Sequence, residues 1–133
     1  FIVGTIDPSI VISADINRLP TVFQNLIDNA FRYTLSGGSV NMFVERKGDK
    51  AVVAVSDTGI GIPEKEKNKI FNKFFRAQNA QKLISAGNGL GLYISQTIVT
   101  GHGGTISFQS KEGEGTTFTV VLPLAPNIPI SSA

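Results

Sequence analysis

The stretch of sequence that decides the fold is residues 25–34, which read Asn25-Leu26-Ile27-Asp28-Asn29-Ala30-Phe31-Arg32-Tyr33-Thr34. It lies in a longer segment, residues 18–35, whose apolar side chains recur at helical spacing. They fall within one broad arc and predict an amphipathic helix. The members of that arc are Leu19, Phe23, Leu26, Ile27, Ala30 and Phe31.

A polar stripe runs beside this apolar arc. Asn25 and Asn29 are four residues apart and share one helix face, and Arg32 and Tyr33 lie one turn further along. Two amide oxygens in register suit Mg²⁺, which prefers oxygen ligands and keeps several waters. Arg32 could meet a phosphate, and Tyr33 a base or ribose. A solvated helix face with ordinary asparagines explains the same pattern, so the stripe alone leaves both interpretations open.

The sequence on either side of this helix predicts where the helix begins and ends and which elements flank it. Asp15 or Asn17 can cap the helix, Pro20 suits its first turn, and Ser36-Gly37-Gly38 ends it. The run Ile10-Val11-Ile12 is a candidate strand. A hairpin follows, in which alternating residues 40–45 pair with the apolar run of residues 51–55 through a turn at Gly48-Asp49.

The second half of the chain repeats this mixture of elements. Pro63 opens a predicted charged helix that ends near Phe75, and residues 76–88 are predicted to be a mobile loop. Residues 89–100 form a predicted helix with Gly101 as its C-cap. The last hairpin pairs residues 105–110 with residues 116–122. The irregular alternation predicts an α+β fold, a two-layer sandwich with one mixed sheet and helices on one face.

Length and composition set further bounds. The chain has 133 residues, which suits one domain. We expect residues 1–9 to be a lead-in from an upstream domain, residues 10–123 to be the domain, and residues 124–133 to be a frayed tail. No apolar run approaches the roughly 18 residues of a spanning helix. The opening without Met, in an apolar segment, indicates a fragment of a longer protein.

The charged and sulfur-containing residues exclude several classes of function. The net charge is +2, from 12 basic and 10 acidic residues, which is too small a surplus to indicate nucleic acid or membrane binding. There are no cysteines, so disulfides and cysteine-type zinc sites are excluded. His102 is the only histidine and is predicted to be a turn residue. The lysines at positions 65, 67, 69 and 73 are expected on a solvated helix side.

Two glycine-rich segments follow apolar elements. The first reads Asp57-Thr58-Gly59-Ile60-Gly61-Ile62-Pro63, and the second reads Gly87-Asn88-Gly89-Leu90-Gly91-Leu92. A carboxylate at a strand end can accept from an exocyclic amine, and glycines let the backbone approach a ligand. Exposed amides at a helix N-terminus suit phosphate. A tight turn and a flexible hinge are the simpler interpretations. Neither segment is a Rossmann fingerprint or a P-loop.

A third candidate segment is aromatic, and reads Phe71-Asn72-Lys73-Phe74-Phe75-Arg76. Three phenylalanines this close together are costly to expose, so they either pack in the core or form a hydrophobic latch for a lid over a ligand.

Taken in order, these segments resemble the catalytic ATP-binding domain of sensor histidine kinases, in the GHKL superfamily. Residues 25–34 resemble the asparagine box, residues 57–62 the first glycine box, residues 71–76 the phenylalanine box and residues 87–92 the second glycine box. The closing segments His102-Gly103-Gly104-Thr105-Ile106 and Gly113-Glu114-Gly115-Thr116-Thr117-Phe118 match as well.

The resemblance implies the Bergerat fold and a role for each matching residue. Asp57 would bind the adenine amino group, and Asn29, assisted by Asn25, would hold Mg²⁺ against the phosphates of ATP. Arg32, in place of the commoner lysine, would meet the phosphates as a fork. Tyr33 would border the adenosine. Residues 76–88 would be the ATP lid, with Phe71, Phe74 and Phe75 at its base. The backbone around the nucleotide would be provided by Gly59, Gly61, Gly87, Gly89, Leu90 and Gly91.

The function implied is presentation of the γ-phosphate of ATP for transfer to a histidine on a separate dimerisation and phosphoacceptor domain of a two-component sensor kinase. A response regulator would act downstream, and the chain would be a monomer in the cytoplasmic portion of a membrane-anchored protein. Related ATPases of the chaperone or gyrase type usually carry a catalytic glutamate where Asn25 stands. The alternatives are a serine kinase of the anti-sigma type and a nucleotide-sensing docking module without catalysis.

Overall fold

The structure, a computed structural model, describes residues 2–3, 10, 12, 14–15, 17–73, 75 and 90–125. Within them, five strands form one sheet in the order β1-β2-β3-β5-β4. The strands are β1 (Ile2–Val3), β2 (Val40–Lys47), β3 (Lys50–Asp57), β4 (Thr105–Lys111) and β5 (Gly115–Pro123). β1 pairs with β2 in parallel, and the other neighbours are antiparallel, so the sheet is mixed as predicted.

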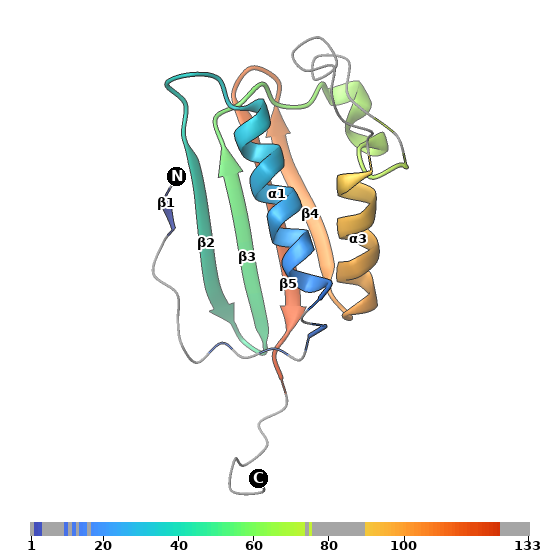
Figure 1. The fold of residues 1–133 in the computed structure, drawn as a ribbon. Helices are drawn as coiled ribbons and strands as arrows, with labels where there is room; N and C mark the ends of the chain where they lie inside the picture. Colours follow the sequence, from blue (N-terminus) through green and yellow to red (C-terminus); the bar gives the residue numbers. More distant parts are fainter. Residues whose placement is uncertain are drawn as a thin grey trace, which may run out of the picture.

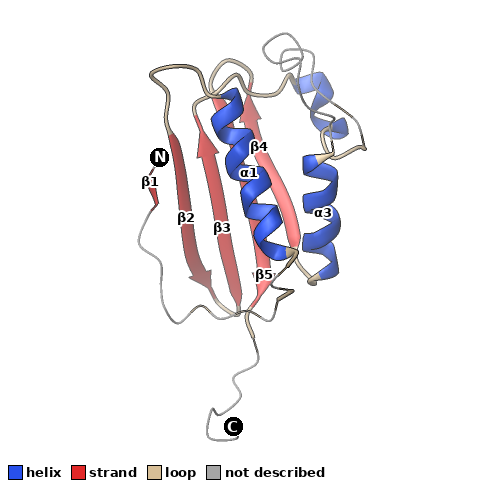
Figure 2. Ribbon diagram, viewed as in Figure 1, coloured by secondary structure: helices blue, strands red, loops and turns tan. Residues whose placement is uncertain are grey.

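The helices lie on one face of this sheet. They are α1 (Leu19–Tyr33), the 3₁₀ helix η1 (Glu64–Lys69) and α3 (Gly91–Gly101). Figure 1 shows α1 and α3 side by side across the sheet, with α3 nearest to β4. The same view coloured by secondary structure shows the two layers directly (Figure 2). The predicted α+β sandwich is therefore confirmed.

α1 forms close to where the sequence places it, but its buried face is rotated slightly. Leu19, Val22, Leu26 and Ala30 are buried, whereas Phe31, which the sequence places in the apolar arc, is 51% exposed. Phe31 lies one residue beyond Ala30 and so about 100° around the helix from the buried stripe. Neither Asp15 nor Asn17 is the N-cap; Arg18 is. The Asp15 carboxylate instead accepts from the backbone N–H groups of Asn17 and Arg18 in the preceding turn.

The central hairpin agrees with the sequence. Lys47 pairs with Lys50 across the predicted turn, where Gly48 has a φ of 61°, a conformation that glycine adopts without steric cost. β3 lies between β2 and β5, and its alternate residues Ala51, Val53 and Val55 are buried. The residues between them are only half-buried because the helices cover one face of the sheet.

Three predicted elements are corrected by the structure. Ile10 and Ile12 are outside any strand, and the short strand in this region is β1, within the predicted lead-in. The charged helix after Pro63 is a single 3₁₀ segment that ends at Lys69. Its apolar content is too low for a longer amphipathic helix. Gly101 is the last residue of α3, and His102 is its C-cap.

The core lies between the helices and the sheet. It is formed by Leu19, Val22, Leu26, Ala30, Val40, Val53, Val55, Ile70, Val99, Phe118, Val120 and Leu122. At the start of the predicted frayed tail, the Leu124 N–H donates to the carbonyl of Asp49 at 3.0 Å, so the described part of this segment is attached to the β2–β3 turn. Among the described residues, no helix has both the length and the apolar character needed to cross a bilayer.

The packing of α1 generates a stability prediction. Leu26 is 1% exposed and Leu35, just beyond the helix, is 57% exposed. We expect Leu26→Ala to lower the free energy of unfolding by about 2–5 kcal/mol, because it leaves a cavity in the core. The matched substitution Leu35→Ala should change it by about 0.5 kcal/mol or less. Urea denaturation followed by circular dichroism measures both. Equal losses in the two variants would contradict the assigned core.

Candidate functional site

The polar stripe of α1 contacts α3 at one end. The side-chain amide nitrogen of Asn25 donates to the backbone carbonyl of Gly91 and to the hydroxyl of Ser95, both at 3.3 Å. Ser95 is fully buried, and Asn25 is half-buried. These two bonds direct the nitrogen of the amide, and not its oxygen, toward α3. Asn25 therefore fixes the first turn of α3, where the second glycine segment ends, against α1.

The same stripe contacts the first glycine segment at its other end. The backbone carbonyl of Tyr33, the last residue of α1, accepts from the N–H of Ile60 at 3.2 Å. A Cβ on Gly59 would collide with this carbonyl group, so only glycine permits the contact. Asn29 is half-buried and lies one helical turn from Asn25 and one from Tyr33. Arg32 is exposed beside it.

Asp57 ends β3 at this same edge of the structure. Its carboxylate is half-buried and accepts from the N–H of Gly59 at 2.8 Å. Burial raises the pKa of the Asp57 carboxyl above its ordinary value of 3.8, and backbone hydrogen bonds from Gly59 and Thr116 oppose that rise. Two backbone donors thus support an acceptor whose charged form is partly desolvated.

The loop that follows Asp57 rests on the β4–β5 turn. Gly61 has a φ of 69°, and a Cβ there would collide with the backbone carbonyl of Lys111. The N–H of Gly113 donates to the carbonyl of Ile60 at 2.8 Å. Glycine at position 61 is required both by the backbone conformation and by the close approach of the turn.

The aromatic segment begins as core packing. The ring of Phe71 meets Phe108 and Phe118 edge-on, with centroids 5.9 and 6.4 Å apart. Phe75 is half-buried and packs against the core cluster. The packing interpretation is therefore confirmed for Phe71 and Phe75. Phe74 lies outside the described residues.

The predicted lid, residues 76–88, and the glycines Gly87 and Gly89 also lie outside the described residues. Of the second glycine segment, Leu90 is the N-cap of α3 and Gly91 is its first residue. The described parts of the asparagine stripe and of both glycine segments thus meet along α1.

Two residues with simple interpretations have specific contacts. His102 is a turn residue, as predicted, whose Nε2 accepts from the N–H of Asp15 at 2.9 Å and whose Nδ1 lies 2.8 Å from the carbonyl of Ile98. Lys67 was expected to be solvated, but its side chain is 27% exposed. It donates to the carbonyl of Ser110 and pairs with Glu64 at 2.7 Å.

Three further polar residues lie at the site, and the sequence pattern did not single out any of their side chains. Ser95, Ser110 and Thr116 each form side-chain or backbone bonds to the predicted site residues or to their loops. Ser95 carried no signal of its own in the sequence, because α3 also contains the polar residues Gln96, Thr97 and Thr100. Thr116 belongs to a segment that the family resemblance already included.

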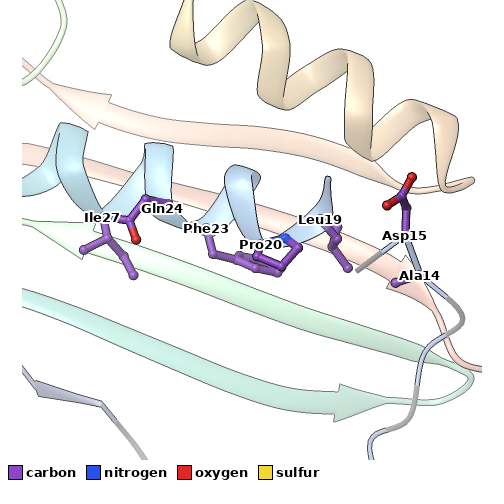
Figure 3. Close-up of a pocket in the computed structure, with 7 residues that line it drawn as sticks. All are labelled: Ala14, Asp15, Leu19, Pro20, Phe23, Gln24 and Ile27. Carbon is purple, nitrogen blue, oxygen red and sulfur yellow. The ribbon is translucent and has the colours of Figure 1, made fainter. Parts of the chain in front are cut away.

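A pocket of about 390 Å³ lies elsewhere on α1. Figure 3 shows it beside the N-terminal half of the helix. Its lining residues are Ala14, Asp15, Leu19, Pro20, Phe23, Gln24 and Ile27. None of them is a predicted site residue. Ile27 and Asn25 point to nearly opposite sides of the helix, two residues being about 200° apart, so this pocket is separate from the site.

Among the residues with described positions, no three His, Cys, Asp or Glu side chains gather where they could hold a metal. The donor set at the site consists instead of side-chain amides. Magnesium at nucleotide sites is bound by few protein oxygens together with phosphate oxygens and waters. Asn29 and Asn25 are compatible with that arrangement.

Comparisons with known proteins agree with this geometry. Residues 14–126 match the family described as histidine kinase-, DNA gyrase B-, and HSP90-like ATPase. The circadian input-output histidine kinase CikA of Synechococcus elongatus is 43% identical over 113 residues, which cover 85% of this chain and 15% of that protein. The sensor histidine kinase WalK of Bacillus subtilis is 37% identical over 125 residues, which cover 92% of this chain and 20% of that protein.

Solved structures give the same result. The catalytic domain of histidine kinase ThkA superimposes with a TM-score of 0.78 at 32% identity, covering 94% of this chain and 80% of that one. The mycobacterial sensor histidine kinase MprB gives 0.78 at 31% identity, covering 86% and 78%. The chain spans a fifth or less of the two curated relatives named above. It belongs to the family of histidine kinase-, DNA gyrase B- and HSP90-like ATPases, and within it resembles the catalytic domains of sensor histidine kinases.

Proposed function

We propose that this chain binds Mg-ATP and presents its γ-phosphate to a histidine on a separate domain of a two-component sensor kinase. The observation that carries the proposal is the double attachment of the α1 stripe. Asn25 bonds to the start of α3, and Tyr33 bonds to the glycine loop after Asp57. Asn29 lies between these two contacts, where a nucleotide held by both glycine segments would pass.

The base would be held at Asp57. Its carboxylate is partly buried and accepts one hydrogen bond from the backbone N–H of Gly59. The exocyclic amine of adenine would donate a further hydrogen bond to this partly desolvated group. The close contact of Gly59 with α1 places this carboxylate next to the end of the stripe, and the half-buried Tyr33 would border the adenosine.

The phosphates would be held further along the stripe. Asn29, with Asn25, would supply amide oxygens to Mg²⁺, and the exposed guanidinium of Arg32 would pair with phosphate oxygens. Leu90 and Gly91 would supply backbone N–H groups at the N-terminus of α3. The rest of the backbone around the nucleotide would come from Gly61, Gly87 and Gly89. Mg²⁺, when bound, would neutralise charge on the phosphate oxygens during transfer.

The receiving histidine would belong to a dimerisation and phosphoacceptor domain of the parent kinase. Both ring nitrogens of His102 already have hydrogen-bond partners, the N–H of Asp15 and the carbonyl of Ile98, which makes His102 a poor phosphate acceptor. We place the response regulator downstream, and the domain, as a monomer, in the cytoplasmic portion of a membrane-anchored protein. The names of the relatives, which are histidine kinases, support a histidine as the phosphate acceptor, and no observation favours a serine kinase or a docking module.

Calorimetric titration of ATP tests the pose. We expect wild-type binding in the micromolar range, about −6 to −8 kcal/mol. Asp57→Asn should weaken ATP and ADP alike by about tenfold or more, because it alters an acceptor for the base. Asn29→Ala should chiefly remove the dependence on Mg²⁺, because it removes an oxygen ligand.

Matched substitutions at exposed positions serve as controls. Asp49→Asn, in the β2–β3 turn, and Asn17→Ala, in the turn before α1, make the same chemical changes at exposed residues and should leave both affinities unchanged. A folded wild-type chain that binds no nucleotide would contradict the proposed function.

Acid should act on binding and on stability in opposite directions through Asp57. As the pH falls through the raised pKa, the Asp57 carboxylate takes up a proton and ceases to be a charged acceptor, so ATP affinity should fall. The folded chain binds that proton more tightly than the unfolded chain does. The empty wild type should therefore gain stability relative to Asp57→Asn as the pH is lowered from the raised pKa toward 3.8.

Titrations and urea denaturation of both proteins at several pH values measure these two trends. An identical pH dependence in wild type and Asp57→Asn would show that another group is responsible.

Phosphotransfer is tested by mixing the chain with the dimerisation and phosphoacceptor domain of the parent kinase and ATP labelled at the γ-phosphate. We expect an acid-labile label on the acceptor domain, because phosphohistidine hydrolyses in acid, and loss of that label with Asn29→Ala. An acid-stable label would favour the serine-kinase alternative. ATP binding without any transfer would favour the docking module.

A further inference from the structure

The hydroxyl of Ser110, at the end of β4, lies at the centre of a small hydrogen-bonding cluster. It accepts from the backbone N–H of Ile62 at 2.8 Å, donates to the carbonyl of Gly115 at 2.9 Å and lies 2.8 Å from the hydroxyl of Thr116. Ser110 is half-buried, and Thr116 is 7% exposed. One side chain therefore joins the glycine loop to both ends of the β4–β5 turn.

The chemistry of these groups fixes the direction of each bond. A serine hydroxyl has one proton and can accept two hydrogen bonds. The N–H of Ile62 can only donate and the carbonyl of Gly115 can only accept, so the Ser110 proton is used by Gly115. The Thr116 hydroxyl must then donate to Ser110. This assignment uses the full hydrogen-bonding capacity of Ser110.

The cluster bears directly on the surroundings of Asp57. Thr116 is the cross-strand partner of Asp57, and its backbone hydrogen bond lowers the pKa of that carboxyl. Gly115 approaches the backbone of Asp57 so closely that a Cβ would collide with the Asp57 carbonyl. Ile62 directly follows Gly61. The partners of Ser110 thus lie at both ends of the loop that runs from Asp57 to Ile62.

The bond from Ser110 differs in kind from the two backbone bonds that hold Ile60, in the middle of this loop. Ile60 is held through its backbone by Tyr33 and Gly113, and neither bond involves a side chain. Near the start of the loop, the side chain of Thr58 accepts from the backbone N–H of Ser39, whereas at Ile62 the backbone of the loop is held by a side chain from β4. Removing the Ser110 hydroxyl should therefore loosen the loop near Ile62 while the helix and sheet contacts remain.

We propose that Ser110 is a positioning residue for nucleotide binding: its hydroxyl holds the loop of residues 57–62 and the Thr116 hydroxyl in the arrangement that the base requires. The inference rests on the proposed function, and deepens it by assigning a role to a residue that would not touch the nucleotide. Loss of the hydroxyl should weaken every nucleotide that uses the base site by a similar factor.

The test compares Ser110→Ala, Ser110→Cys and Ser110→Thr with wild type. We expect Ser110→Ala to weaken ATP and ADP equally, by about tenfold, since it leaves a backbone donor without its acceptor. Ser110→Cys keeps the volume but offers only a weak acceptor, so its loss should be comparable. Ser110→Thr keeps the hydroxyl and should restore binding. The matched control is Ser107→Ala, at an exposed position of the same strand.

Hydrogen exchange of the Ile62 amide, measured by NMR without nucleotide, is the second readout. It should accelerate in Ser110→Ala and Ser110→Cys and return toward wild type in Ser110→Thr. A purely structural role would lower thermal stability but leave the nucleotide affinity of the folded protein unchanged. If Ser110→Cys, or a folded Ser110→Ala, binds both nucleotides within about twofold of wild type, the inference is wrong.

The two proposals fail in different ways. A folded wild-type chain that binds no nucleotide overturns the proposed function and, with it, the role of Ser110 in binding. Normal wild-type binding that Ser110→Ala and Ser110→Cys both retain overturns the inference alone. If Ser110→Ala does not fold, Ser110→Cys and the Ile62 exchange rate decide the result.

Discussion

The arrangement of the site depends on one backbone contact, the hydrogen bond between the carbonyl of Tyr33 and the N–H of Ile60. This contact brings the loop after β3 against the C-terminal end of α1, at a separation that a side chain on Gly59 would not permit. Because Leu26 and its neighbours anchor α1 in the core, the loop that is bonded to α1 is also held in place. Asp57 and the C-terminal end of α1 are thereby held near one another although they belong to different elements.

The same helix meets two requirements with adjacent stripes. One stripe is apolar and buried against the sheet, and the next is polar and bonded to α3 through Asn25. A rotation of the helix that improved one contact would disturb the other, because the helix geometry fixes the angle between the two stripes. This explains why the predicted apolar arc was slightly wrong. Helical spacing places Phe31 in the apolar arc, whereas in the structure it is 51% exposed and Asn25 bonds to Ser95 of α3.

Local pattern was sufficient for elements whose signals are local. The hairpin with its turn at Gly48 and the apolar centre of β3 needed only a few neighbouring residues to be recognised. β1 depends on a parallel partner about 40 positions away, so no local pattern could reveal it. The segment after Pro63 has charges suited to a helix but little apolar surface, and it stops after one 3₁₀ stretch that Lys67 attaches to β4.

For the site, the sequence identified the segments but not the bonds between them. The asparagines and glycines were found because they recur at informative spacing, and the structure brings their described parts together along α1. Serines are common and have no such spacing, so Ser95 and Ser110 became visible only when distant strands and helices were placed side by side. Their roles depend on tertiary contacts, which is where single-sequence reasoning has least information.

The surroundings of Asp57 place an ionisable carboxyl where burial opposes its charge. Burial disfavours the ionised carboxylate, while the N–H groups of Gly59 and Thr116 compensate only in part. A domain selected for stability alone would have a neutral or apolar residue at the end of a half-buried strand. The loop, the β4–β5 turn and the Ser110 cluster instead hold backbone donors around this charge. The backbone bonds from Gly59 and Thr116 therefore support one acceptor whose charge is energetically costly to the empty domain, and a ligand that donates to it would recover part of that cost.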